Sequence, residues 1–308
     1  MWPRSLLAIA DLPPADIELL LDRAQAQKAD PSGPHGRACA GRSLALLFEK
    51  PSLRTRVSFE LAMQRLGGTA LYLSPAEVGL GKREPVKDVA RVLGGYCDAI
   101  ACRTFSQEVL VELADWSGVP VINALSDWEH PCQALADLLT VREQLGGTQG
   151  HTLAYVGDGN NVARSLALGA ASVGMHVRLA SPPAFTLDEA STTVAASRGE
   201  ASGGSIRLLE DPREAVAGAD VVYTDVWTSM GQEDEAAARR RAFLGYQVSR
   251  ELLALARPGA IVMHDLPAHR GEEITDAAIE SEQSVVFAQA ENRLHAQQAV
   301  LWRLVGQD

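Results

Sequence analysis

The feature that most constrains the fold is a regular alternation of short apolar segments with longer segments of helical periodicity. Strand-like segments are expected at residues 43–48, 69–74, 99–103, 119–124, 152–157, 176–181, 205–209, 220–226 and 259–264. Helical spacing of apolar residues fills the gaps in the first half at 53–66, 85–95 and 107–117. Such alternation predicts an α/β protein whose parallel sheets are covered by helices on both faces.

The chain has 308 residues, which is long for one ordinary domain and predicts two. We expect a doubly wound parallel-sheet domain at 1–146 and a second at 147–290. The two would be joined by a helix that begins at Pro131 and ends at Gly146. The helical segment 291–308 would pack back on the first domain. Because ligands of such sheets bind beyond the carboxyl ends of the strands, we expect the active site in the cleft between the domains.

The composition excludes several classes of function. The net charge of −11 argues against nucleic acid and anionic membranes as partners. No apolar run approaches 18 residues and the first residues do not resemble a secretory leader, which favours the cytoplasm. The four cysteines lack the paired spacing of a metal site or a disulfide framework. An anionic substrate would therefore need a local basic cluster.

The segment Ser52-Leu53-Arg54-Thr55-Arg56 follows the first predicted strand and begins a helix. Free amides at a helix N-terminus, next to two arginines, suit an anion such as phosphate. The alternative is an ordinary helix capped by Ser52, with arginines that are solvated.

Two further polar groups follow strands in the first half. Arg103 ends the third strand, where its guanidinium would bind either a ligand anion or a structural carboxylate. His130 directly precedes the helix that starts at Pro131, and it could donate a hydrogen bond to a polarised carbonyl or simply belong to the loop.

In the second half, Gly157-Asp158-Gly159-Asn160-Asn161 resembles part of a dinucleotide fingerprint. The third glycine would fall at Val162, so the match fails and a nucleotide site is not expected. Asn161 suits the polar groups of a small amino acid, although an asparagine here is more often a helix cap.

Carboxylates follow the later strands. Asp225 begins a loop that reaches Ser229, and Asp265 follows His264 at the end of the last strand. Either carboxylate could bind an ammonium group or accept its proton, or it could be an ordinary loop residue. The first half thus offers donors to an anion and the second half offers carboxylates to an amine.

Together these residues resemble the aspartate/ornithine carbamoyltransferase family, and its ornithine-using members most closely. The likeness covers almost the whole chain, from 48–56 through 130–133 to 291–293. It implies a carbamoyl phosphate site formed by Ser52, Leu53, Arg54, Thr55, Arg103, His130, Pro131, Cys132, Gln133 and Arg293. It implies an ornithine site formed by Asn161, Asp225, Ser229, Met230, Asp265 and Leu266. The catalytic groups among them would be Thr55, Arg103, His130 and Asp265.

The resemblance implies transfer of the carbamoyl group from carbamoyl phosphate to the side-chain amine of L-ornithine, giving L-citrulline and phosphate in arginine metabolism. It implies no metal or cofactor, and a homotrimer or a multiple of one. The chain departs from the family at Asp265, where ornithine-using members carry cysteine, and at Gly79, where members often carry glutamine. The first departure leaves a different amine acceptor open, and a non-catalytic paralogue that binds carbamoyl phosphate is the other alternative.

Overall fold

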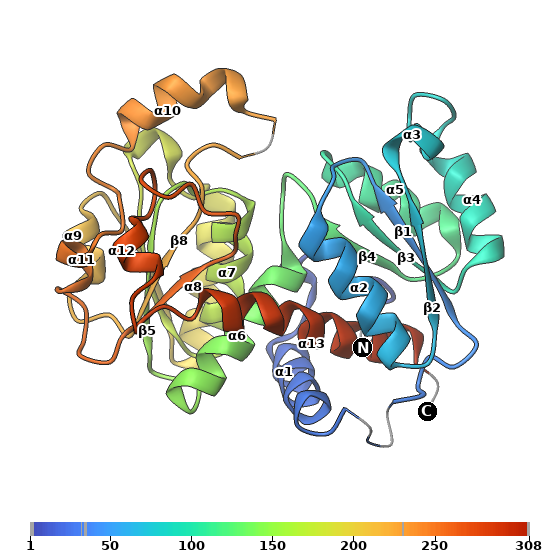
Figure 1. The fold of residues 1–308 in the computed structure, drawn as a ribbon, viewed down its shortest axis with the longest axis horizontal. Helices are drawn as coiled ribbons and strands as arrows, with labels where there is room; N and C mark the ends of the chain where they lie inside the picture. Colours follow the sequence, from blue (N-terminus) through green and yellow to red (C-terminus); the bar gives the residue numbers. More distant parts are fainter. Residues whose placement is uncertain (1–2, 32, 34–35, 230, 307–308) are drawn as a thin grey trace. The chain divides into compact units, whose positions relative to one another are not determined.

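The computed structural model describes residues 3–31, 33, 36–229 and 231–306, and these form two compact units (Figure 1). The first unit comprises the described residues of 1–139 and 291–308, and the second comprises 140–290. The division falls inside helix α6 (Pro131–Leu145) and helix α13 (Val286–Val305). The first unit therefore consists of two segments that are distant in the sequence.

The first unit is built on a parallel sheet with the strand order β2-β1-β3-β4. Its strands are β1 (Ser43–Phe48), β2 (Thr69–Leu73), β3 (Ala99–Arg103) and β4 (Val121–Leu125). Its helices besides α13 and the start of α6 are η1 (Ile9–Asp11), α1 (Pro14–Ala29), α2 (Leu53–Arg65), α3 (Pro75–Val78), α4 (Val86–Tyr96) and α5 (Gln107–Ser117). The chain leaves β1 in one direction through α2 and returns past it through α4, so right-handed crossovers place these two helices on opposite faces.

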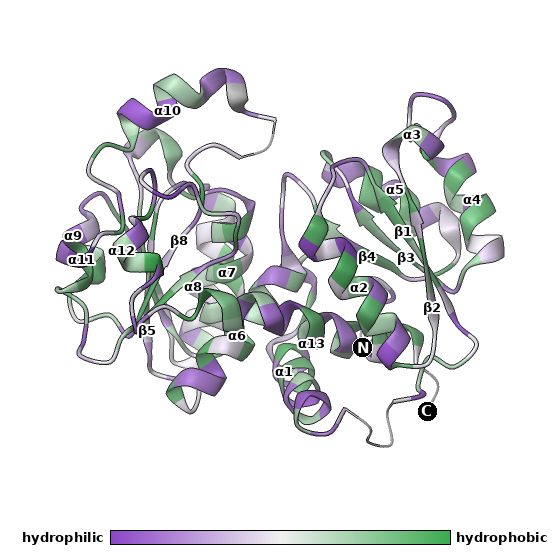
Figure 2. Ribbon diagram, in the orientation of Figure 1, coloured by the Kyte–Doolittle hydropathy of each residue, from purple (hydrophilic) through white to green (hydrophobic). Residues whose placement is uncertain are grey.

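The central strands of this sheet are buried on both faces, as expected for a parallel sheet covered by helices. Every residue of β3 is buried, and so are five of the six residues of β1. The apolar core beneath α4 and α5 joins residues of β1, β3 and β4, and hydrophobic colour follows these strands in Figure 2. Strand β2 lies at the edge and leaves Leu71 exposed.

The second unit has a parallel sheet of order β7-β6-β5-β8-β9. Its strands are β5 (Thr152–Val156), β6 (His176–Ala180), β7 (Ser205–Leu209), β8 (Val221–Thr224) and β9 (Ile261–His264). Its helices besides parts of α6 and α13 are α7 (Asn161–Ser172), η2 (Pro183–Phe185), α8 (Glu189–Ser202), α9 (Pro212–Val216), η3 (Glu233–Glu235), α10 (Ala236–Ala242), α11 (Arg250–Leu253) and α12 (Asp276–Ile279).

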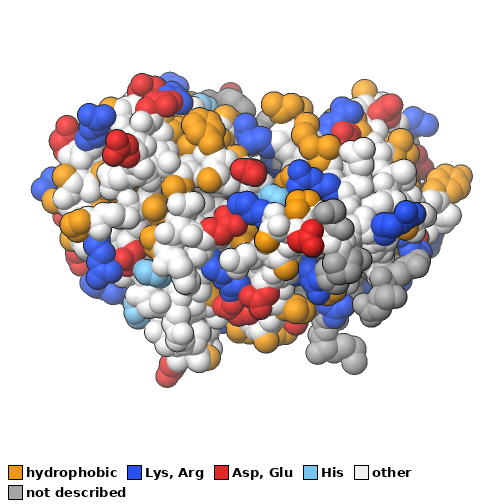
Figure 3. Space-filling view, turned by 60° about the horizontal axis from the view of Figure 1, so that its bottom comes forward, with side chains coloured by type: hydrophobic (Ala, Val, Ile, Leu, Met, Phe, Trp, Pro, Cys, Tyr) orange, Lys and Arg blue, Asp and Glu red, His pale blue; other side chains and the backbone are white. Residues whose placement is uncertain are grey.

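The predicted fold class is confirmed, since each unit is a doubly wound parallel sheet and all nine predicted strands are present within two residues of their expected limits. Among the described residues, every helix is too short or too polar to cross a bilayer. Positive and negative side chains are interspersed on the face shown in Figure 3.

Candidate active site

The strand orders show where each sheet can present polar groups. The order reverses between β1 and β3 in the first unit and between β5 and β8 in the second. At such a reversal the loops leave the carboxyl ends of neighbouring strands in opposite directions and open a crevice. Ser52 follows β1 and Arg103 ends β3, while Asn160 follows β5 and Asp225 follows β8. Three of the predicted residues, Ser52, Arg103 and Asp225, thus lie at the two reversal points.

Helix α2 begins with a side-chain cap that leaves its first turn open to a ligand. The Ser52 hydroxyl accepts a hydrogen bond from the Thr55 amide at 3.3 Å and donates one to the Thr55 hydroxyl at 3.0 Å. Arg56 points elsewhere, because its Nε bonds to Glu60 at 2.9 Å and its guanidinium lies over the Tyr72 ring. The helix is therefore capped by Ser52, as the alternative to a phosphate site predicts. The first-turn amides that Ser52 does not use still favour an anion.

Arg293 of α13 joins the start of α2 to the start of α6. Its guanidinium donates to the Thr55 hydroxyl at 3.2 Å and to the side-chain oxygen of Gln133 at 2.6 Å. Gln133 in turn donates to Asp137 at 2.8 Å. All four side chains are buried, so a positive charge is held inside the unit by directed hydrogen bonds.

His130 is buried beside two arginines. Burial lowers its pKa well below the ordinary value, and the charges of Arg293 and then Arg103 lower it further. Arg103 is itself buried at the end of β3, where the register of β3 against β4 shifts. A neutral imidazole between two fixed cations is suited to a polarised carbonyl oxygen rather than to holding a phosphate by charge.

The other residues predicted for the donor site have different surroundings. The Leu53 side chain is 76% exposed, so only its backbone is suited to a ligand in this unit. Pro131 is the first residue of α6, and Arg54 is half-buried. The buried Cys132 thiol lies 3.8 Å from the Asn123 carbonyl, and burial raises its pKa to about 12. Cys132 therefore stays protonated and is not a nucleophile.

In the second unit, Asn160 is the N-cap of α7. Its side-chain oxygen accepts the amides of Val162 and Ala163 at 3.0 Å, and its nitrogen donates to Asp225 at 2.7 Å. Gly159 permits this turn, because a Cβ there would lie 2.5 Å from the Leu187 amide nitrogen. The predicted Asn161 is the first residue of the helix and is half-buried.

Asp225 and Asp265 form a pair of carboxyl groups. A hydrogen bond joins them, and it requires that one of the two carry a proton. Burial raises the pKa of Asp225 well above its usual range, and the neighbouring charge of Asp265 raises it further. Ligand-type atoms of Asp225, His264 and Asp265 all lie within 4.8 Å of one another. The pair therefore titrates as a unit, and the buried Asp225 keeps its proton to a higher pH than a free carboxyl group does.

His264 lies behind this pair in a fully buried position. Its Nε2 is 3.0 Å from Glu273, and its Nδ1 accepts the Leu266 amide at 2.9 Å while lying 3.4 Å from Asp265. Burial alone lowers the pKa of His264, but the hydrogen bonds that the ring donates to Asp265 and Glu273 outweigh it and raise the pKa to about 10. With a pKa of about 10 both ring nitrogens carry protons at neutral pH, so Nδ1 faces Asp265 as a donor, and the hydrogen bond from the Leu266 amide belongs to the neutral ring.

The loop after β8 is fixed by Arg239 of α10. Its guanidinium bonds to Asp158 at 2.8 Å and to the Trp227 carbonyl at 3.1 Å. Ser229 is half-buried, and its amide donates to Gln232 at 3.1 Å. Met230, predicted to contact ornithine, lies outside the described residues.

Sequence reasoning missed Asn160 and Glu273. Asn160 had a usable signal, since an asparagine directly before a helix is a common cap. Glu273 had none, because it is nine residues from His264 in a polar stretch and only the fold buries it against the ring.

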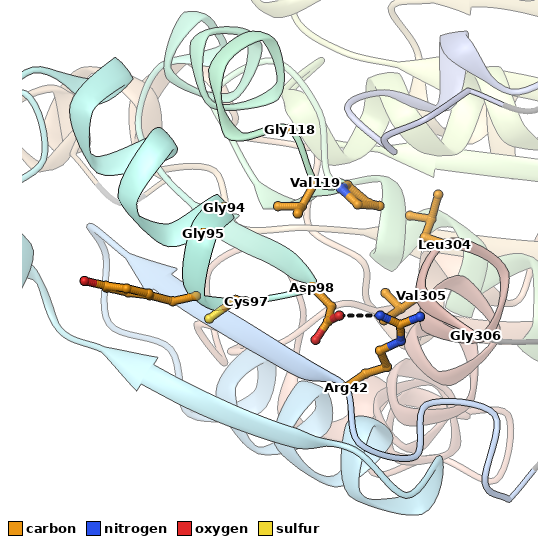
Figure 4. Close-up of a pocket in the computed structure, with 12 residues that line it drawn as sticks. Arg42, Gly94, Gly95, Cys97, Asp98, Gly118, Val119, Leu304, Val305 and Gly306 are labelled. Atoms are coloured by element: carbon orange, nitrogen blue, oxygen red, sulfur yellow. Dashed lines mark hydrogen bonds and ion pairs between the residues drawn. The ribbon is translucent and has the colours of Figure 1, made fainter.

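A cavity of about 500 Å³ lies elsewhere in the first unit (Figure 4). Its lining includes Arg42, which is paired with Asp98 at 2.6 Å, and residues 304–306. Arg42 directly precedes β1 and Asp98 directly precedes β3, so the cavity is at the amino ends of the strands. It is separate from the candidate residues, which follow the carboxyl ends.

Two family models match the chain in consecutive parts. The carbamoyl-P binding domain of aspartate/ornithine carbamoyltransferases matches residues 4–143, and the Asp/Orn binding domain matches 149–304. The chain belongs to the aspartate/ornithine carbamoyltransferase family. Among relatives of this carbamoyltransferase, an ornithine carbamoyltransferase of Acidothermus cellulolyticus is 54% identical over 97% of the chain and 95% of that protein.

Solved structures agree with this membership. The ornithine carbamoyltransferase of Pyrococcus furiosus has a TM-score of 0.93 and 49% identity, covering 96% of this chain and 95% of that one. The ornithine carbamoyltransferase of Gloeobacter violaceus has a TM-score of 0.90 and 48% identity, covering 99% of each chain.

We predict that His130 stays neutral in the folded carbamoyltransferase at mildly acidic pH. Its pKa is lowered on folding, so below about pH 6.5 the unfolded chain binds a proton that the folded chain does not. Stability should therefore fall with decreasing pH by up to about 1.4 kcal/mol per pH unit from this group, and His130→Asn should remove that component. Urea denaturation of both proteins between pH 5 and 7 measures the difference. Equal slopes, or an NMR titration of His130 near pH 6.5, would contradict the prediction.

Proposed function

We propose that this carbamoyltransferase moves the carbamoyl group of carbamoyl phosphate to the side-chain amine of L-ornithine, giving L-citrulline and phosphate. The observation that carries the proposal is the buried cluster of Thr55, Gln133 and Arg293 beside a neutral His130. It supplies both an anion site and an uncharged donor to a carbonyl. The names of the relatives support ornithine as the acceptor.

In this proposal the donor binds to the first unit. Its phosphate lies on the first turn of α2 at Ser52, Leu53, Arg54 and Thr55, against the amides that the Ser52 cap does not use, with Arg54, Arg103 and Arg293 balancing its charge. Its carbonyl oxygen accepts hydrogen bonds from His130, Arg103 and Thr55. These donors become more effective as negative charge develops on that oxygen, and each is typically worth about 3 kcal/mol of barrier. The early residues of α6, Pro131, Cys132 and Gln133, position His130 and Arg293.

The acceptor binds to the second unit. Asp225 and Asp265 receive the side-chain ammonium group, and Asn161, Ser229, Met230 and Leu266 orient the amino-acid end. The ammonium group first gives one proton to the carboxyl pair. The neutral amine nitrogen then attacks the carbamoyl carbon, and the bond to the phosphate oxygen breaks. The phosphate leaves with its electron pair and takes up the second proton that the nitrogen loses. Because a free alkyl amine has a pKa of about 10, the rate should rise with pH until the amine is neutral.

We predict that citrulline formation with ornithine exceeds product formation with lysine, putrescine or aspartate by at least about tenfold in kcat/KM. The reason is that the carboxyl pair requires a cationic amine, while its distance from the amino-acid contacts fixes the length of the acceptor. A colorimetric citrulline assay and phosphate release measure the outcome. Higher turnover with another amine would overturn the acceptor, and phosphate release with none, alongside tight binding of the donor, would favour a non-catalytic paralogue.

We predict that Asp265→Asn lowers kcat about 100-fold, because the amide can no longer share a proton with Asp225. Asp265→Cys, which introduces the residue of ornithine-using relatives, should retain more activity than the asparagine variant without exceeding the native enzyme. Glu251→Gln, an exposed change on α11, is the matched control and should leave kcat unchanged. A large gain in Asp265→Cys would mean that the native aspartate hinders ornithine chemistry.

We also propose that the enzyme is a homotrimer or a multiple of one. Helix α2 exposes Leu53, Val57 and Leu61 at intervals of four residues, and the edge strand β2 exposes Leu71. Such an apolar surface is uncommon on a monomer and favours burial against another copy. Light scattering should give three times the 32.9 kDa chain mass or a multiple of that value, and Leu61→Glu should reduce it. A monomeric native protein would contradict the proposal.

We also propose that the enzyme is located in the cytoplasm and acts in arginine biosynthesis. The four cysteines are all free thiols, and three of them are buried. Free thiols agree with a reducing compartment.

A further inference from the structure

Glu129 is a buried carboxylate next to His130 in the sequence that the proposed chemistry does not use. Its side chain is fully enclosed, and its Oε2 accepts the Ile9 amide at 2.7 Å across 120 residues of sequence. Ile9 begins the short helix η1, whose cap position is Ala8. An alanine has no side-chain acceptor, so the carboxylate supplies the acceptor that the start of η1 lacks.

Residue 129 is also held through its backbone. Its amide donates to the Ser126 hydroxyl at 3.2 Å, and its carbonyl accepts the Ser126 amide at 3.0 Å and the Asn123 side chain at 3.3 Å. The residue before His130 is thus fixed at its side chain, its amide and its carbonyl. On the other side, Pro131 starts α6 and restricts the backbone of His130 to extended conformations.

The N-terminal segment (residues 6–11) is anchored to strand β4, whose Asn123 also contacts Glu129. Leu6 forms a parallel bridge with Ile122 of β4, with its carbonyl accepting the Asn123 amide at 2.8 Å. The Leu7 carbonyl accepts the Asn123 side chain, also at 2.8 Å. Asn123 therefore contacts both the N-terminal segment and the carbonyl of Glu129.

We infer that Glu129 is a positioning residue for His130, and that the N-terminal segment acts through it to set the direction in which the imidazole meets the carbamoyl carbonyl. The inference rests on the proposed function, because it concerns the same imidazole. The carboxylate does not touch the reacting atoms. It fixes the peptide that precedes His130, and a displacement of about 1 Å in a catalytic group can lower a rate about 100-fold.

The first test is truncation of the carboxylate. Glu129→Ala should lower kcat 10- to 100-fold while changing the KM for carbamoyl phosphate less than threefold, because the phosphate contacts remain. Glu129→Gln keeps an oxygen that can accept the Ile9 amide and should restore kcat to within about fivefold of the native value. A drop in melting temperature with unchanged kcat in Glu129→Ala would show a purely structural role and would overturn the inference.

A second variant breaks the same contact from the other side, in case Glu129→Ala does not fold. Ile9→Pro removes the amide and leaves Glu129 in place. It suits the backbone, since Ala8 is already extended (φ −149°, ψ 155°) and proline is accepted at the first position of a helix. The same fall in kcat with little change in KM is expected, and native kcat would count against the inference.

A double variant tests whether Glu129 acts through His130. If it does, Glu129→Ala combined with His130→Asn should have the kcat of His130→Asn alone. A further loss of tenfold or more would contradict the inference. Asp211→Ala is the matched control, because Asp211 caps the short helix α9 by accepting the Arg213 amide in the second unit. It should lower the melting temperature and leave kcat unchanged.

These outcomes remain distinct from failure of the proposed function. A native protein that forms no citrulline overturns the function, whereas an active protein whose kcat is insensitive to Glu129→Ala overturns only the positioning role.

Discussion

The first unit depends on the two hydrogen bonds that Arg293 donates to Thr55 and Gln133. A guanidinium inside a protein is costly unless acceptors surround it, and hydrogen bonds to a charged group contribute about 1.5–3 kcal/mol each. The same bonds tie the starts of two helices to a third. They also place a fixed positive charge beside His130, which helps to keep that imidazole neutral. A chain with a net charge of −11 thus concentrates positive charge at one location inside it.

The second unit instead places two acidic groups close together. Two carboxyl groups, Asp225 and Asp265, are held so close that they cannot both be ionised without a large cost. The cap residue Asn160 orients the first of them, and His264 with Glu273 lies behind the second. Leu266 has a left-handed backbone with φ of 57°, which costs about 1–2 kcal/mol for a residue with a side chain.

The strands and the fold class could be predicted because buried parallel strands are short apolar runs, as in Ala99–Arg103. Residues such as Thr55 and Arg103 could be found because they follow such runs directly. Long-range partners could not, since nothing local marks the contact of Ile9 with Glu129 or of His264 with Glu273. The cap of α7 could not be fixed from the sequence either, because two consecutive asparagines can both accept the next amides and only the fold selects Asn160. The geometry of a site thus depends on contacts between residues that are far apart in the sequence, and hydrophobic periodicity does not reveal these contacts.

The division of the first unit into two segments has a consequence for the order in which the protein is made. Its sheet and helix α2 are complete when residue 139 has been synthesised, but Arg293 follows only after the whole second unit. During translation the first unit exists for a time with Thr55 and Gln133 present and without the arginine that joins them. Domains tend to fold as units while the chain emerges, so the second unit can fold before Arg293 joins the first unit. The nascent chain therefore cannot form the buried cluster of Thr55, Gln133 and Arg293 until the second unit has been synthesised.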